Sequence, residues 1–180
     1  PVITIGPAVS ALYTITMREA RHEGGYIFKP FFKAFKNNFK QAFLLSILYL
    51  IIGASFVFGV KFWIEKPEFS TVNQVILVIT GVFAVIFIFS LFYVFALIAR
   101  FDNTIFKSVK NAVMLAVFNL RETFLLTLIH VIVIVLMIFT KGIWIFMMVG
   151  GFSVSAYINS LLFIRVFRQY EKIEGGNHDD

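Results

Sequence analysis

The stretch FKPFFKAFKNNFKQAFLLSILYLIIGASFVFGVKFW, residues 28–63, holds two patterns in succession. From residue 43 to residue 63 only Lys61 is charged. A run of about 20 mostly apolar residues is long enough for a helix to cross a bilayer. In residues 28–42, phenylalanine and lysine instead recur with helical spacing. The stretch therefore predicts a helix in the headgroup layer, followed directly by a membrane-spanning helix.

The helix predicted for residues 28–42 has two parallel stripes. One face carries Phe28, Phe31, Phe32, Phe35 and Phe39, and beside it lie Lys29, Lys33, Lys36 and Lys40. An apolar face of this kind lies on the acyl chains, and each lysine near anionic lipid contributes about 1 kcal/mol. We expect these residues to bind anionic headgroups of the bilayer. The alternative is a docking face for a cytoplasmic or membrane partner.

The composition of the whole chain agrees with a membrane protein. Of 180 residues, 59% are hydrophobic and 14% charged, whereas soluble domains have roughly 45–50% and about 25%. Cysteine is absent, which excludes disulfides and thiolate metal sites. The net charge of +6 comes from basic residues at the ends of apolar segments. This placement favours the membrane surface, and we expect no nucleic-acid partner.

The fold expected is an all-α integral membrane protein, a single transmembrane domain of residues 1–180. Four spans are predicted at 43–63, 75–99, 123–140 and 143–167. Residues 1–17 form a shorter fifth, which we expect to be the end of a helix that starts upstream; the alternative is a re-entrant or interfacial segment. A second amphipathic helix is predicted at 104–120. Residues 171–180 are expected to be a disordered cytoplasmic tail.

The basic residues predict the orientation of these spans. One side receives 13 of the 16 lysines and arginines, and the other receives three, which are Lys61, Lys66 and Lys141. Cytoplasmic loops carry the excess of positive charge. We therefore expect the N-terminus outside, the C-terminus inside, and both amphipathic helices on the cytoplasmic side.

Part of the sequence is repeated at an offset of 81 residues. NFKQAFLLSILYLII, residues 38–52, aligns without a gap on NLRETFLLTLIHVIV, residues 119–133. Asn38 then corresponds to Asn119, and Tyr49 to His130. The pattern indicates a surface helix followed by a span, used twice. Either a duplication of this unit or the shared physical requirements of two such units would explain the repeat.

Two segments near the ends of the chain carry small or polar residues at helical spacing. Gly6, Ser10 and Thr14 lie at i, i+4 and i+8, and so do Gly151, Ser155 and Asn159. Small residues let helices approach closely in lipid, and hydroxyls and amides bond across the contact. We expect either helix packing within the bundle or contact with a span of another protein.

His130 is the only ionisable side chain deep in a predicted span. Such groups are candidates for function, and His130 could serve as a proton or substrate site or only bond a neighbouring helix. No mid-span carboxylate, metal-ligand spacing or catalytic motif accompanies it. We therefore predict no enzyme activity, no catalytic residues, no cofactor and no metal.

Five phrases occur in a characteristic order: TIGPAVSALY (4–13), FFKAFKNNFKQA (31–42), ARFD (99–102), VKNAVMLA (109–116) and FNLRETF (118–124). Together they resemble the YesL-like family of small bacterial membrane proteins. The resemblance implies a multi-pass protein of the bacterial cytoplasmic membrane. It carries over no catalytic residues. Arg121 and Glu122 stand where the family more often has a proline.

Members of this family are commonly encoded beside carbohydrate ABC importers and glycan-degrading enzymes. The resemblance therefore leads us to expect an accessory, non-catalytic subunit that packs against the permease subunits of such an importer. One alternative is a stand-alone small transporter or channel, in which His130 would act. Another is a membrane-bound regulator that docks a cytoplasmic partner through residues 29–40.

Overall fold

A computed structural model describes residues 2–65, 70–139 and 151–175 of the chain, and within these ranges all regular structure is helical. The helices are α1 (Val2–Ala20), α2 (Phe28–Ile64), α3 (Thr71–Arg100), α4 (Ile105–Phe118), α5 (Leu120–Phe139) and α7 (Phe152–Gly175). The predicted helical class is thus confirmed for the described residues.

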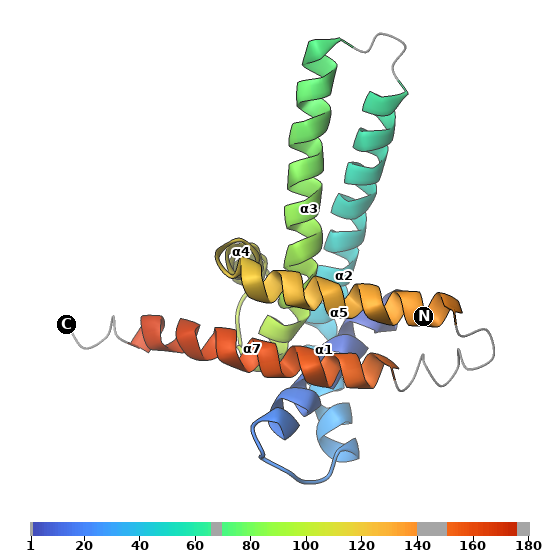
Figure 1. The fold of residues 1–180 in the computed structure, drawn as a ribbon. Coiled ribbons are helices and arrows are strands. Elements are labelled where there is room, and N and C mark those ends of the chain that lie inside the picture. The colour runs from blue at the N-terminus through green and yellow to red at the C-terminus, as the bar shows by residue number, and fades with distance from the viewer. Residues whose placement is uncertain (1, 66–69, 140–150, 176–180) are drawn as a thin grey trace.

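Helices α2 and α3 form a long antiparallel hairpin that projects from the other helices (Figure 1). They have 37 and 30 residues, and at 1.5 Å per residue either exceeds a hydrocarbon core of about 30 Å. The start of α3 is fixed by Ser70, whose hydroxyl accepts a hydrogen bond from the Asn73 N–H. Both helices are long and apolar enough to cross a membrane, which marks the chain as a membrane protein.

The expectation of a separate surface helix at residues 28–42 is wrong. These residues are the first part of α2, which continues without a break into the predicted span. No glycine or proline lies between Pro30 and Gly53, so nothing interrupts the backbone hydrogen bonds. The phenylalanine and lysine stripes therefore extend the axis of the span by about 22 Å.

The second amphipathic segment does form a helix of its own. The Thr104 hydroxyl caps the start of α4, and α4 meets α5 at a 97° bend. Asn119 lies at the bend with a non-helical backbone (φ −113°, ψ 55°). Its side-chain Nδ2 donates to the Leu115 carbonyl oxygen at 3.1 Å, which caps α4.

Helices α5 and α7 run in opposite directions and lie across the α2–α3 hairpin (Figure 1). By length and composition the described residues contain two candidate spans, or three if the bent pair α4–α5 is one span. The other predicted spans and the orientation remain predictions. The segment 140–150, which holds the start of the predicted span 143–167, lies outside the described residues.

The predicted disordered tail begins too early. Residues 171–175 prolong α7 to Gly175, because Glu171, Lys172 and Glu174 favour helix and follow a helix that is already formed. Residues 176–180 lie outside the described part of the chain.

The core lies where the middle of α2 and the last third of α3 meet the remaining helices. Buried residues on α2 end at Tyr49, and those on α3 begin at Ser90. Small residues let the backbones come close, and aromatic rings fill the space between them. Ala11, Ala42, Ala96 and Ala112 are fully buried, as are Tyr93, Phe163 and Phe167. In the described outer half of the hairpin, residues are exposed or partly buried, and none is fully buried.

Candidate functional site

All four lysines of the stripe are exposed, but the five phenylalanines do not share one environment. Phe28 and Phe32 are 80% and 64% exposed. Phe31, Phe35 and Phe39 are half-buried and contact one another in sequence along α2. Phe31 stacks on Phe35 with centroids 6.5 Å apart, and Phe35 meets Phe39 edge-to-face at 5.5 Å. The ladder continues to Phe43 at 6.1 Å. The lysine stripe thus faces outward along one continuous helix, whereas the phenylalanine stripe is exposed only in part.

Polar residues on the other side of the same segment join it to the rest of the protein. Asn38 Nδ2 donates to Ser10 Oγ on α1 at 3.2 Å. Gln41 Nε2 donates to the carbonyl oxygen of Asn103, just after α3, at 2.6 Å. Sequence analysis did not single out Asn38 or Gln41 as contact residues. Their position on the helix face opposite the two stripes was the available signal.

The small-residue stripe of α1 packs against α2 and α3. A side chain at Gly6 would collide with Ser46 and would lie 2.9 Å from the Ala42 carbonyl oxygen. Ser10 accepts the hydrogen bond from Asn38, and Thr14 Oγ1 donates to the Ala99 carbonyl oxygen at 3.4 Å. Internal packing therefore accounts for Gly6, Ser10 and Thr14.

The stripe of α7 faces α1. Ser155 and Asn159 are buried, and Asn159 Nδ2 donates to Tyr13 Oη at 3.5 Å. Gly151, directly before α7, is partly buried. Thr16 Oγ1 of α1 also lies 2.7 Å from Ser160 Oγ of α7, so these two hydrogen bonds to α7 come from Tyr13 and Thr16 of α1.

Two tyrosine hydroxyls make further buried hydrogen bonds between helices. Tyr93 Oη on α3 lies 2.9 Å from Thr123 Oγ1 on α5. Tyr49 Oη on α2 lies 3.0 Å from Ser90 Oγ on α3. Sequence analysis missed these pairs, because a tyrosine within an apolar run does not reveal which helix its hydroxyl reaches.

His130 on α5 is partly buried and stacks on Phe92 of α3, with ring centroids 4.5 Å apart. Its Nδ1 lies 2.7 Å from the carbonyl oxygen of Leu126. A carbonyl oxygen only accepts, so Nδ1 carries the proton and Nε2 of the neutral ring is an acceptor. Nε2 has no hydrogen-bond partner among the described residues.

His130 lines a pocket of about 370 Å³. The walls come from four helices: α1 (Ile5, Val9, Tyr13), α2 (Ser46, Tyr49, Leu50), α3 (Phe87, Leu91, Phe92, Phe95) and α5 (His130). Tyr49 stacks on Phe87 with centroids 4.8 Å apart. Tyr49 and His130, which correspond in the internal repeat, thus both stack on α3 and line the same pocket.

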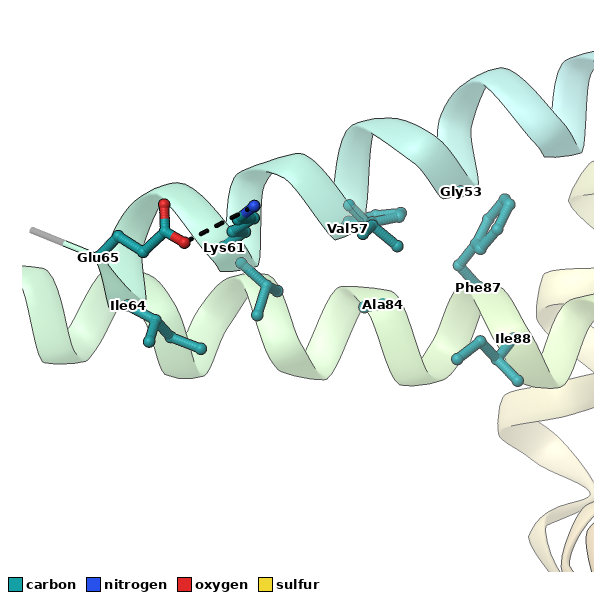
Figure 2. Close-up of a pocket in the computed structure, with 10 residues that line it drawn as sticks. Gly53, Val57, Lys61, Ile64, Glu65, Ala84, Phe87 and Ile88 are labelled. Atoms are coloured by element: carbon teal, nitrogen blue, oxygen red, sulfur yellow. Dashed lines mark ion pairs between the residues drawn. The ribbon is translucent and has the colours of Figure 1, made fainter.

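A second hollow of about 570 Å³ lies between the outer halves of α2 and α3. Val57 and Gly53 of α2 face Phe87, Ala84 and Ile88 of α3 (Figure 2). The Lys61–Glu65 ion pair lies at its outer end, on α2, with Nζ and Oε1 3.7 Å apart. Both side chains are well exposed, so the pair contributes little stability. This hollow offers apolar contact without hydrogen-bonding groups at its centre.

Within residues 2–65, 70–139 and 151–175, no three histidines, cysteines or carboxylates gather as a metal ion would require. The model of a protein family described as a protein of unknown function, DUF624, matches residues 1–60. This is the YesL-like family, and the match covers α1 and most of α2. No curated protein and no solved structure matches the chain.

Proposed function

We propose that the chain is an accessory, non-catalytic membrane subunit that packs against the spans of another membrane protein. The observation that supports this role is the isolated outer half of the α2–α3 hairpin. Its large apolar side chains, among them Val57, Phe58 and Val82, are more than half exposed. No other described helix of the chain covers them (Figure 1).

Apolar surface alone does not select a protein partner, because lipid covers it equally well. Small residues make the difference, since they let a second backbone approach closely. Ala54 and Ser55 are exposed on α2, and a side chain added at Gly81 of α3 would meet nothing within 4 Å. The hairpin therefore offers positions with small side chains, at which another span could pack closely.

The partner class rests on the resemblance to the YesL-like family: the permease of a bacterial carbohydrate ABC importer. The test is affinity purification of the tagged chain from its native host in a mild detergent. We expect the permease and ATPase subunits of one importer to co-purify. If they are absent while the tagged chain is intact and abundant, the proposal is wrong.

The proposed contact face on the outer half of the hairpin can be tested separately. The chain has no cysteine, so each introduced cysteine is its only thiol. We would introduce single cysteines as Ser55→Cys and Gly81→Cys on the exposed hairpin. Ser90→Cys, at a fully buried position of α3, is the matched control. Each cysteine is alkylated with a maleimide that carries a benzophenone, and photo-cross-links to a partner are expected for the first two variants only. Equal cross-linking of the control would contradict this face.

A stand-alone transporter is a second candidate, favoured by the pocket that contains His130. Purified protein in liposomes would then move a sugar or an ion by itself, and His130→Ala would abolish the flux. Flux that persists in this variant would remove the support that the pocket gives to this candidate.

A membrane-bound regulator is a third candidate, favoured by the exposure of Phe28 and Phe32 at the free start of α2. A cytoplasmic partner would bind these rings together with the neighbouring lysines. Binding that survives replacement of Lys29, Lys33, Lys36 and Lys40 by glutamine would count against this candidate.

A further inference from the structure

The polar atoms around the His130 pocket are not equivalent. The Ser46 hydroxyl donates to the Ala42 carbonyl oxygen at 2.8 Å, and the Tyr49 hydroxyl pairs with Ser90. Both are thus engaged within the protein. Nε2 of His130 is different, because Nδ1 holds the proton and Nε2 keeps a lone pair without a donor among the described residues. The Tyr13 hydroxyl, which also lines the pocket, accepts from Asn159 Nδ2 at 3.5 Å. Among the polar side chains of the wall, only that of His130 presents a ring nitrogen that accepts without donating.

The other residues of the pocket wall determine the charge and the size of a ligand that would fit. None of the lining residues carries a formal charge when His130 is neutral, and most are aliphatic or aromatic. An ionised headgroup would lose its hydration there without gaining a counter-ion. A volume of about 370 Å³ lies within the range of pockets that hold small organic ligands.

The pocket is accessible from the side of the protein. Ile5 and Leu50 at its rim are 57% and 54% exposed, and Leu91 is also exposed. Leu50 and Leu91 belong to the two candidate spans, α2 and α3. A ligand dissolved in the bilayer could therefore reach the pocket laterally, without passing through water.

We propose that this pocket binds a neutral, hydroxyl-bearing amphiphile from the bilayer. Its hydroxyl donates a hydrogen bond to Nε2 of His130, and its apolar chain lies against the side chains of α1, α2 and α3. This inference does not rest on the proposed subunit role, and either can fail without the other.

The probe for the test is hexadecan-1-ol with a diazirine in its chain and a terminal alkyne, added to the purified full chain in lipid nanodiscs. Photolabelled peptides are mapped by mass spectrometry. We expect adducts concentrated at the rim residues Ile5, Leu50 and Leu91, and competition by unlabelled hexadecan-1-ol. The methyl ether of the probe, which cannot donate, should label about fivefold less, as the loss of one hydrogen bond in a membrane implies.

Two variants distinguish the contribution of the probe's hydroxyl to binding from that of its alkyl chain. His130→Phe keeps a ring on Phe92 but removes the acceptor, so alcohol and ether should then label equally. Leu50→Trp fills the rim of the pocket and should reduce labelling by both probes. Ile51→Trp, at an exposed neighbouring position outside the pocket, is the matched control and should change neither.

Three results would overturn the proposal. One is equal labelling by alcohol and ether in the unaltered protein. Another is adducts spread along the α2–α3 hairpin without enrichment at the pocket. The third is stronger labelling by a hexadecanoic acid probe than by the alcohol, which would show that the pocket takes an anion.

Discussion

Thr16 Oγ1 on α1 and Ser160 Oγ on α7 lie 2.7 Å apart, although 144 positions separate them in the sequence. Each hydroxyl also lies near a carbonyl oxygen of its own helix, that of Leu12 or Ala156. The hydrogen bond between the two hydroxyls uses the proton of only one of them. That hydroxyl donates to the other hydroxyl, which in turn donates to the carbonyl oxygen of its own helix. This hydrogen bond therefore joins the two ends of the chain without leaving either hydroxyl unsatisfied.

A double-mutant cycle with Thr16→Ala and Ser160→Ala should measure this contact. We expect a coupling energy of about 0.6 kcal/mol, and no more than about 2 kcal/mol, as found for hydrogen bonds between membrane helices. The measurement is the free energy of unfolding in mixed micelles titrated with sodium dodecyl sulfate. A control cycle pairs Thr16→Ala with Ser55→Ala, at an exposed position whose hydroxyl bonds its own helix, and should be additive. Additivity in both cycles would contradict the contact.

Gly6→Ala should destabilise the protein, because the added methyl group would collide with Ser46 and lie 2.8 Å from Phe95 Cε1. Overpacking of this kind costs about 1–3 kcal/mol in the free energy of unfolding. Gly81→Ala is the control, since a methyl group there meets nothing within 4 Å. It should leave stability unchanged or raise it slightly through helix propensity. If both variants are equally stable, α1 does not pack on α2 as described.

Tyr93→Phe should lower the free energy of unfolding by about 0.6–2 kcal/mol. The change removes the hydroxyl that lies 2.9 Å from Thr123 Oγ1, at a fully buried position. The threonine hydroxyl still has carbonyl oxygens of Ala116 and Asn119 to donate to, so the loss stays within that range. Tyr157→Phe removes the same hydroxyl from an exposed position of α7 and should have no measurable effect. An equal loss in both variants would assign the effect to the residue type and not to the bond.

The sequence was sufficient for the helical membrane class, because composition and apolar run length do not depend on which helices are neighbours. It was insufficient for the continuity of α2. Asn38 and Asn119 occupy equivalent places in the internal repeat, yet α2 continues through Asn38 and the chain bends at Asn119. The Asn38 side chain donates to Ser10 on α1, whereas that of Asn119 donates back to Leu115 of its own helix. This difference depends on α1, which the local sequence does not contain.

The small-residue stripes also show that the local sequence does not reveal which helices are neighbours. Ser10, Ser155 and Asn159 are buried in the structure. Their spacing in the sequence did not indicate that the stripe of α1 faces α2 and α3 while the stripe of α7 faces α1. The pocket around His130 also needed tertiary structure, because its walls come from segments up to 125 residues apart in the sequence, from Ile5 to His130.

The lysines of α2 should differ in their contribution to anionic lipid binding. Because α2 is one continuous helix, Lys29 lies about 17 Å farther along the axis from the predicted span than Lys40 does. Electrostatic attraction to the membrane surface falls off over a Debye length of about 8 Å at physiological salt. Lys36 and Lys40 are closer to the span, so each should contribute about 1 kcal/mol to the binding of anionic lipid. Lys29 and Lys33 should contribute much less.

The comparison is between the double variants Lys36→Gln/Lys40→Gln and Lys29→Gln/Lys33→Gln. The measurement is the fraction of phosphatidylserine that co-purifies from mixed-lipid nanodiscs. We expect a clear loss for the first variant and little for the second. Lys61→Gln, at the opposite end of α2, is the control for a change of charge as such. Equal losses from the two double variants would indicate that residues 28–42 lie flat in the headgroup layer, as a separate surface helix would, because all four lysines would then be at the same depth.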